Sequence, residues 1–205
     1  MFFVFDGVDG AGKSTQLNLF ADWLQERDLD VVCCSDPGTT ELGHEMRNLL
    51  LGKHAIDIHM RSEMLMFMTA RCQLVEEWIR PALAAGKTVI CDRYVFSTVV
   101  YQGHAGNLDP AEVWQVNQIA TAGLMPDLTF IFDLDVASAS ERLGASRDRM
   151  ESRGTGYFER VRDGFLKEAE RWPEVTRVID ASGEIDAIQA TLRQAAEPLL
   201  QKRSR

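Results

Sequence analysis

The segment GVDGAGKST, residues 7–15, constrains this chain more than any other part of its sequence. It follows the short apolar run FFVF (2–5) and precedes a helical spacing of apolar residues over 13–27. Glycines let backbone N–H groups turn inward around phosphate oxygens, and the N-terminus of the next helix favours an anion. A glycine-rich turn with a surface lysine is the alternative interpretation, but the strand and helix context favours a phosphate-binding loop.

Within this segment, four residues fit the pattern G-x-x-x-x-G-K-[ST]: Gly7, Gly12, Lys13 and Ser14. Lys13 is expected to reach the β- and γ-phosphates of a nucleoside triphosphate, and Ser14 to offer its hydroxyl to Mg²⁺. The nucleotide-binding residues predicted from the loop are Gly7, Gly10, Ala11, Gly12, Lys13, Ser14 and Thr15.

The chain alternates short apolar runs with longer helical periods, a pattern typical of βαβ units and a parallel sheet. Strands are predicted at 2–5, 31–34, 88–91, 128–134 and 175–179, the first four being nearly continuous apolar runs typical of strands covered on both faces. Helices are predicted at 13–27, 41–51, 61–85, 110–122, 136–143, 157–171 and 184–200. Pro81 should kink the longest of these helices or start a new turn. We therefore expect an α/β fold with a five-stranded parallel sheet flanked by helices, as a single domain over residues 1–205.

Composition excludes several classes of protein. A hydrophobic content of 45% and a charged content of 26% fit an ordinary globular protein, and no apolar run approaches the roughly 20 residues that span a bilayer. FFVF is too short for a signal-peptide core, so a cytoplasmic protein is expected. The net charge of −9 argues against a general nucleic-acid binder. Cysteines at 33, 34, 72 and 91 form no metal-binding spacing, and reduced, buried thiols are expected.

A second candidate site residue ends the predicted strand in TVICDR (88–93). A carboxylate at this place suits binding of Mg²⁺ by Asp92, directly or through water. By itself such an aspartate could equally cap a turn or form a salt bridge. Arg93 would project into the same cleft, because ligands of open α/β sheets bind at the carboxyl ends of the strands.

The phosphate loop alone leaves GTPases, ATPases and small-molecule kinases open. The chain has no guanine-reading Asn/Thr-Lys-x-Asp segment. Phe67 and Arg71 lie four residues apart in a helical segment, so an aromatic ring and a guanidinium share one face that could stack a base and bind its carbonyl edge. A core stripe with a snorkelling arginine is the alternative. Further polar readout could come from Ser97, Tyr101 and Gln102, each of which could also be a surface residue.

Four segments together resemble the thymidylate kinase family of P-loop nucleoside monophosphate kinases: DGVDGAGKST, FMTARCQLVEEWIRPALAAGK, CDRYVFSTVVYQG and DLDVASASERL. The similarity covers nearly the whole chain in order. It implies transfer of the γ-phosphate of ATP to dTMP, with Mg²⁺ as cofactor, and a homodimer.

The resemblance also implies how the acceptor is held. Phe67 would stack on thymine, and Arg71 and Gln102 would read its O4 and N3 edge. Tyr101 would pack by the deoxyribose and disfavour a 2′-hydroxyl, whereas Arg47 would hold the dTMP phosphate. The full set of implied substrate-binding residues is Asp9, Asp36, Arg47, Phe67, Arg71, Arg93, Ser97, Tyr101 and Gln102.

On the donor side, the resemblance places Ala181, Ser182 and Gly183 around adenine, with Arg142 stacking there. Ser14 and Asp92 would hold the metal. Asp9 would approach the sugar 3′-hydroxyl and the network of waters around the metal.

The arginine-rich segment ASRDRMESRGTG (145–156) resembles the lid of this family. Some members carry a catalytic arginine in the phosphate loop at the position of Gly10, and others supply arginines from the lid. An arginine that arrives on closure would neutralise charge on the migrating phosphoryl group and exclude water. A solvated surface run of charge is the alternative. The implied catalytic residues are Lys13, Asp9, Arg93, Arg147, Arg149 and Arg153.

One departure concerns the turn after the second predicted strand. The family usually has Arg-Glu-Pro-Gly there, whereas this chain has Ser35, Asp36, Pro37 and Gly38. The missing arginine at Ser35 leaves open a nucleotide-binding protein with little turnover. Another nucleoside or nucleotide kinase is a second alternative, which the base pocket distinguishes. Phe67, Arg71 and Gln102 suit a pyrimidine with a carbonyl at position 4 better than cytosine, whose amino group would meet a donor arginine.

Overall fold

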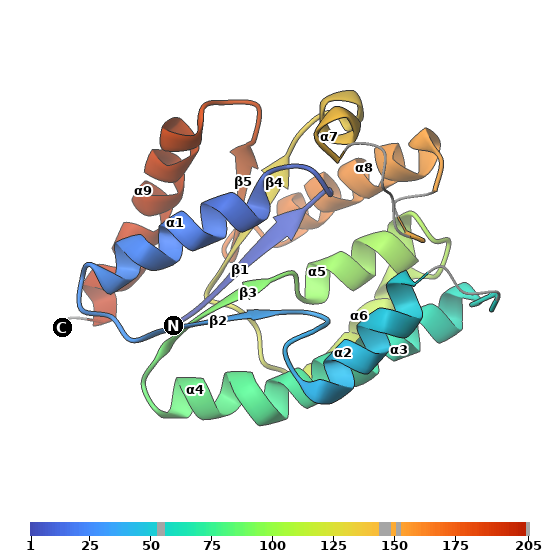
Figure 1. Cartoon of the computed structure of the whole chain (residues 1–205), viewed down its shortest axis with the longest axis horizontal. Coiled ribbons are helices and arrows are strands. Elements are labelled where there is room, and N and C mark those ends of the chain that lie inside the picture. The colour runs from blue at the N-terminus through green and yellow to red at the C-terminus, as the bar shows by residue number, and fades with distance from the viewer. Residues whose placement is uncertain (53–55, 144–148, 151–152, 204–205) are drawn as a thin grey trace.

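The computed structural model describes residues 1–52, 56–143, 149–150 and 153–203. Within these residues one parallel sheet runs in the order β2-β3-β1-β4-β5 (Figure 1). Its strands are β1 (Phe2–Gly7), β2 (Val31–Ser35), β3 (Thr88–Asp92), β4 (Leu128–Asp133) and β5 (Thr176–Asp180). The predicted five-stranded parallel sheet is confirmed, with every strand found within two residues of its expected bounds.

Helices cover both faces of this sheet (Figure 1). On one face α1 (Lys13–Gln25) packs against α9 (Ile185–Arg203). On the other, α4 (Arg80–Ala84), α5 (Val95–Thr98) and α8 (Thr155–Arg171) contact the strands. The remaining helices are α2 (Glu41–Leu51), α3 (Met60–Leu74), α6 (Pro110–Thr121) and α7 (Val136–Leu143), with π-helical segments η1 (Val75–Ile79) and η2 (Val99–His104).

Pro81 begins a new helical segment, as the sequence predicts. The predicted helix 61–85 is α3, followed by the π-helical η1 and then by α4, with the proline in the first turn of α4. The chain stays helical through this junction, where the N–H of Arg80 donates to the carbonyl of Val75 five residues earlier. The segment after β3 is more helical than expected, since α5 runs directly into η2.

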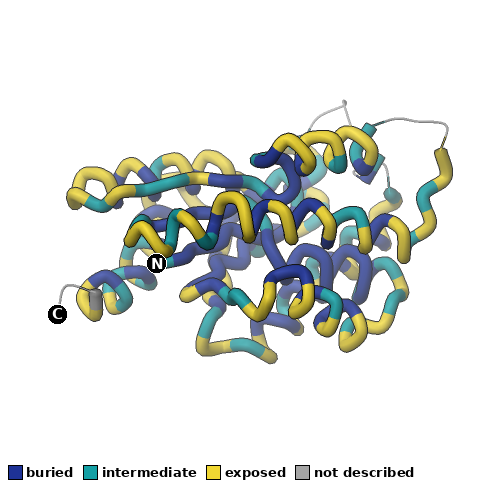
Figure 2. The backbone as a smooth tube through the Cα atoms, turned by 90° about the horizontal axis from the view of Figure 1, so that it is seen from below, coloured by how far each residue is buried: buried dark blue, intermediate teal, exposed yellow. Residues whose placement is uncertain are grey.

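Burial departs from the prediction at the edge of the sheet. The central strands β1, β3 and β4 are buried almost throughout, as expected, but β2 is not. Figure 2 shows buried residues gathered in the middle of the molecule and exposed ones on its outer segments. Because β2 is an edge strand, Cys33 is exposed there, and Cys72 is exposed on α3. The prediction of buried thiols is therefore right for Cys34 and Cys91 and wrong for the other two.

An aromatic cluster fixes β1 between its neighbours. Phe5 lies 5.1 Å from Phe130 of β4, ring centre to ring centre, and Phe20 of α1 lies 5.3 Å from Phe3 and 5.5 Å from Phe130. Edge-to-face pairs of this kind add to the burial of apolar area. The cluster holds the strand from which the phosphate loop starts and the helix into which it leads.

No helix in the described part of the chain is long and apolar enough to cross a membrane.

We expect Phe130→Ala to lower the free energy of unfolding by about 3–5 kcal/mol, because the ring is fully buried and its removal leaves a cavity. The measurement is the midpoint of urea denaturation, with one common slope of unfolding free energy against urea concentration used for wild type and variants. Val178→Ala on β5 is the matched control, because this side chain is 48% exposed, and we expect a change within about 0.5 kcal/mol. Equal losses in the two variants would contradict this account of the core.

Candidate active site

The phosphate loop connects β1 to α1, and its backbone requires glycine at several places. Gly7, Gly10 and Gly12 all have positive φ angles, of 130°, 83° and 82°. A Cβ atom at Gly7 would lie 2.4 Å from the carbonyl oxygen of Phe132, and one at Gly10 would lie 2.3 Å from that of Ala139. The loop is therefore fitted against β4 and α7, and side chains are excluded from both contacts.

The contact at Gly10 bears on where catalytic arginines can come from. Any side chain at this position would overlap the Ala139 carbonyl and approach the side chain of Leu143. An arginine in the phosphate loop, as in some members of the resembled family, does not fit this backbone. Cationic groups other than Lys13 must reach the phosphates from outside the loop.

Lys13 is the first residue of α1 and is almost completely buried. Its Nζ donates to the carbonyl oxygens of Val8 at 2.7 Å and Gly7 at 3.2 Å. Burial, together with the nearby positive charge of Arg93, lowers the pKa of Lys13 to about 8. The ammonium group is thus held against the loop and titrates close to physiological pH.

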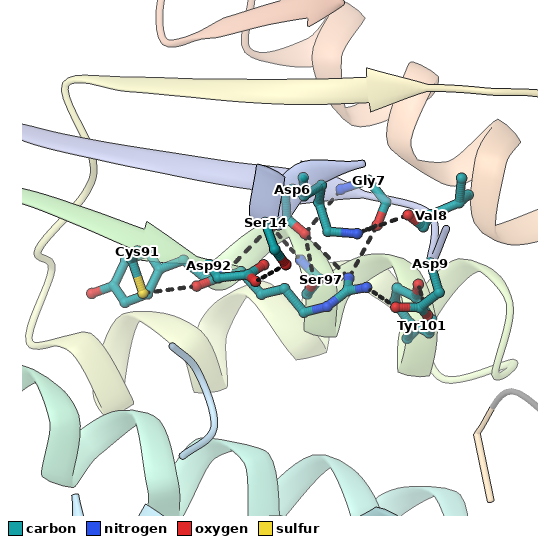
Figure 3. Close-up of polar contacts among 12 residues, drawn as sticks. Asp6, Gly7, Val8, Asp9, Ser14, Cys91, Asp92, Ser97 and Tyr101 are labelled. Carbon is teal, nitrogen blue, oxygen red and sulfur yellow. Dashed lines mark hydrogen bonds and ion pairs between the residues drawn. The ribbon is translucent and has the colours of Figure 1, made fainter. Parts of the chain in front are cut away.

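Ser14 and Asp92 lie together at the opening of this loop (Figure 3). The Ser14 hydroxyl donates to Oδ2 of Asp92 at 3.4 Å, whereas Oδ1 of Asp92 is buried with no hydrogen-bond partner among the described residues. A hydroxyl and a carboxylate with a free oxygen fit a Mg²⁺ ion, which takes its other ligands from phosphates and water. No cluster of three or more His, Cys, Asp or Glu side chains that could hold a metal ion occurs in the described ranges.

Arg93 is held by residues from the phosphate loop and from α5. Its φ angle is 69°, an uncommon conformation for a residue with a side chain. The guanidinium donates to the carbonyl of Gly7 and the hydroxyl of Ser97, both at 3.1 Å, and to Asp9. Asp9 also accepts from the Tyr101 hydroxyl at 3.0 Å. Burial would raise the pKa of the Asp9 carboxyl, but Arg93 and Lys13 outweigh it and the pKa is lowered.

Asp6 was not identified from the sequence, although it organises this arginine. It is fully buried, and it accepts from the Ser97 hydroxyl at 2.5 Å and from the backbone N–H groups of Ser97 and Tyr94. Burial raises the pKa of Asp6 although Arg93 lies nearby. A carboxylate within an otherwise apolar strand was the available signal. Ser97 was expected beside the base, but its hydroxyl donates its hydrogen bond to Asp6.

A cavity next to Arg93 brings together every residue predicted to bind the acceptor. The predicted residues that line it are Asp9, Asp36, Arg47, Phe67, Arg71, Arg93, Ser97, Tyr101 and Gln102. Pro37, Leu51, Thr98 and Met150 are the other described residues that line it. A second cleft over the phosphate loop shares Asp9, Asp36, Arg47 and Arg93 with it, so the two open onto the same groups.

Arg71 is not the snorkelling side chain that the sequence left open. It is only 1% exposed, and its Nε lies 2.5 Å from Asp36 in a buried ion pair. The other nitrogens donate to the carbonyl of Tyr94 at 3.0 Å and to the side chain of Asn117 on α6. Burial raises the pKa of Asp36 even with Arg71 against it, and the second carboxylate oxygen has no partner among the described residues. Asp36, on its shorter side chain, thus fixes the orientation of the guanidinium.

Thr98 is a further residue that the sequence analysis missed. It lines the acceptor cavity, is 2% exposed, and its hydroxyl has no hydrogen-bond partner in the described part of the chain. A buried polar group of this kind is costly unless a ligand satisfies it. Its place directly after Ser97 was the only sequence signal.

Two of the predicted lid arginines pair with a buried carboxylate, and one of them, Arg153, also lines a cavity with Val8 and Asp9 of the phosphate loop. Arg147 falls outside the described residues. Arg149 and Arg153 both form ion pairs with Glu63 on α3, the second at 2.8 Å. Arg149 also donates to the carbonyl of Leu50 at 2.7 Å. Their side chains are 21% and 19% exposed, so they are not a solvated run of surface charge.

On the donor side, Arg142 lies beside the loop expected to surround adenine. Its guanidinium donates to the carbonyl of Ala181 at 3.3 Å, and it lines the cleft over the phosphate loop. The Ser182 hydroxyl donates to Asp180 at 2.6 Å within its own turn and does not line that cleft.

A parallel sheet with this phosphate loop after its first strand fits the P-loop kinase fold, and the adjoining acceptor cavity suits a kinase of nucleoside monophosphates. Residues 5–192 match the family model described as Thymidylate kinase. The chain belongs to the thymidylate kinase family.

Individual relatives agree with this assignment. The chain is 42% identical to a thymidylate kinase of Rhodopirellula baltica over 187 residues, which cover 91% of this chain and 76% of the relative. It is 39% identical to a thymidylate kinase of Exiguobacterium sibiricum, with coverage of 100% and 97%. The crystal structure of thymidylate kinase from Ehrlichia chaffeensis superposes with a TM-score of 0.80 at 32% identity, covering 95% of this chain and 97% of that one.

We expect Gly10→Ala to destabilise the protein by more than about 1–2 kcal/mol, because the new Cβ meets the Ala139 carbonyl and alanine disfavours a positive φ. Gly154→Ala is the matched control, because no atom lies within 4 Å of its Cβ position and its φ is −63°. Thermal melts of both variants give the comparison, at about 2–4 °C per kcal/mol for a chain of this size. A melting temperature of Gly10→Ala equal to that of the control would show that the loop can move away from α7.

Proposed function

We propose that this protein transfers the γ-phosphoryl group of ATP to the phosphate of dTMP, giving ADP and dTDP. The observation that carries the proposal is the meeting of two sites. The nine acceptor residues line one cavity, and four of them also line the cleft over the phosphate loop. Phosphoryl transfer requires this juxtaposition, because donor and acceptor must be held in line.

The donor would be bound at the phosphate loop. Backbone N–H groups of the loop and the N-terminus of α1 would surround the β- and γ-phosphates, and Lys13 would turn from the loop carbonyls toward them. Ser14 and Asp92 would hold Mg²⁺, which supplies neutralisation of phosphate charge when bound. Arg142 and the turn at Ser182 would lie by the adenine.

The acceptor would be bound between α3 and the segment that contains α5 and η2. Phe67 would stack on the thymine, and Arg71, held by Asp36, would donate to O4. The buried ring of Tyr101, fixed by its bond to Asp9, would lie by the deoxyribose and leave no room for a 2′-hydroxyl. The carbonyl of Pro37 accepts from Arg47 at 3.0 Å, which would direct that guanidinium toward the dTMP phosphate.

Catalysis would then consist of alignment and neutralisation of charge. A phosphate oxygen of dTMP attacks the γ-phosphorus, and this oxygen is already ionised at neutral pH, so the reaction needs no general base. Arg93 and Lys13 would neutralise the charge of the transition state, with Arg93 oriented by Asp9. Arg147 of the 145–156 segment would add positive charge when the substrates are in place, whereas Arg149 and Arg153 would stay paired with Glu63.

We also propose that the protein is a cytoplasmic homodimer. An apolar partner face would contain Leu65 of α3 and Ile119 of α6, two helices that pack together. Ile119 is 80% exposed and Leu65 is 48% exposed. A second copy of the chain would cover these side chains.

We expect ADP formation to depend on the acceptor, with dTMP preferred over dUMP, dCMP and dGMP and little ADP formed without acceptor. Lys13→Ala should abolish transfer, because it removes the cation that reaches the phosphates. A coupled ADP assay with Mg-ATP measures both. Binding of ATP without transfer to any nucleotide would instead favour the non-catalytic alternative and direct attention to Ser35.

We expect ATP affinity to fall as pH rises through about 8, because free Lys13 loses its proton there and with it one positive charge. At pH 9 only about a tenth of Lys13 would be protonated, so Kd should rise by up to about tenfold relative to pH 7. Calorimetric titration with ATP at each pH measures this. Bound phosphates favour the protonated form of Lys13. The value of kcat at saturating ATP should therefore stay constant to a higher pH than the ATP affinity does.

The matched control for this titration is Lys13→Arg, whose guanidinium stays protonated throughout the range. Its ATP affinity should be nearly independent of pH, whatever its absolute value. The assignment would fail if the wild-type Kd were constant between pH 7 and 9, or if Lys13→Arg showed the same dependence.

A further inference from the structure

Glu63, in the first turn of α3, connects three parts of the protein although it lines neither the acceptor cavity nor the cleft over the phosphate loop. Its carboxylate is fully buried. Oε1 accepts from the amide nitrogen of Gln102 at 2.9 Å. Oε2 accepts from Arg153 at 2.8 Å and from Arg149. A buried carboxylate with three side-chain partners from η2 and from the arginine-rich segment calls for an explanation beyond packing.

The two arginines compensate the charge of this carboxylate. A lone ionised carboxylate without water is strongly disfavoured, and paired guanidinium groups with good hydrogen bonds offset that cost. An ionised carboxylate is an acceptor only, because it carries no proton to donate. Arg149 and Arg153 both donate to Oε2, so Glu63 serves as an acceptor in this cluster.

This property fixes the orientation of the Gln102 amide. A glutamine amide has a donor end and an acceptor end, and the two are distinguished by their partners. Because Glu63 can only accept, the Nε2 group of Gln102 must face it. Gln102 lines the acceptor cavity, so its carbonyl oxygen is the end that remains for a bound base.

The chemistry of the pyrimidine edge then follows. Thymine and uracil carry a proton on N3 and can donate it to a carbonyl oxygen, whereas N3 of cytosine is a lone-pair acceptor that would oppose that oxygen. We propose that Glu63 is a positioning residue that holds Gln102 with its carbonyl toward the cavity and thereby selects a base with a proton on N3. This inference rests on the proposed function, because it assumes that a pyrimidine monophosphate occupies this cavity.

The test is Glu63→Gln, which keeps the shape and replaces the acceptor-only group by an amide. The new amide can also donate, so Gln102 can turn over and present its nitrogen to the cavity. The readout is the ratio of kcat/KM for dUMP to kcat/KM for dCMP, since these nucleotides differ only at the N3–C4 edge of the base. We expect this ratio to fall at least tenfold, about the value of one hydrogen bond.

The matched control is Glu77→Gln at the end of the same helical segment. Glu77 also accepts from a glutamine amide, that of Gln73 at 2.8 Å, but this pair is exposed and lies outside the cavity. We expect the ratio in this variant to equal that of the wild type. A merely structural role for Glu63 would lower activity with both nucleotides in parallel, and an unchanged ratio in Glu63→Gln would overturn the proposal.

Two further variants keep the test decisive. Glu63→Gln leaves two arginines without a carboxylate, so Glu63→Gln with Arg153→Gln restores the net charge of the cluster in case the single variant does not fold. The ratio should fall in this variant too, whatever its absolute rate, and a wild-type ratio would count against the proposal.

In a Gln102→Ala background, Glu63→Gln should leave the ratio unchanged, because Glu63 acts through Gln102. A further loss there would also contradict the proposal.

Failure of the inference is distinguishable from failure of the proposed function. If the wild-type protein phosphorylates dTMP but Glu63→Gln has the same ratio of kcat/KM for dUMP to kcat/KM for dCMP as the wild type, only the role of Glu63 is wrong. If the wild-type protein phosphorylates no pyrimidine monophosphate, the proposed function is wrong and the premise of this inference fails with it.

Discussion

The pairing of buried carboxylates with arginines, at the carboxyl ends of β1 and β2 and in the first turn of α3, is the constraint on which the rest of the structure depends. Asp6, Asp36 and Glu63 are each at most 3% exposed, and each lies against an arginine. Removing one member of such a pair leaves an uncompensated charge and costs about 3–5 kcal/mol. Burial of the aromatic cluster around β1 stabilises the fold and so offsets the cost of burying these charges.

The same pairs set the geometry of recognition. Arg93 is held between Asp9 and Ser97, and Arg71 between Asp36 and the carbonyl of Tyr94. A guanidinium held by such partners points its remaining N–H groups in one direction. Less side-chain conformational entropy is therefore lost when a ligand binds. Stability and specificity are therefore carried by the same side chains in this protein.

Sequence reasoning reached the sheet, most helices and the residues around both clefts, because hydrophobic periodicity and the phosphate loop are local signals. It missed Asp6, Glu63 and Thr98, whose importance arises from partners distant in the chain: Glu63 meets Gln102 and Arg153 only after α3, η2 and the start of α8 have packed. It was also wrong about Cys33 and Cys72, because an apolar run does not reveal whether a strand lies at the edge of a sheet or which side of a helix faces outward.

The contact between Gly10 and the Ala139 carbonyl limits how this protein can evolve. Two strategies for supplying arginine exist in the resembled family, and a single base change at a glycine codon can encode arginine. Here that mutation would force α7 away from the phosphate loop before any catalytic benefit could appear. The path from one strategy to the other must therefore include substitutions in α7, the helix whose Ala139 carbonyl meets the loop.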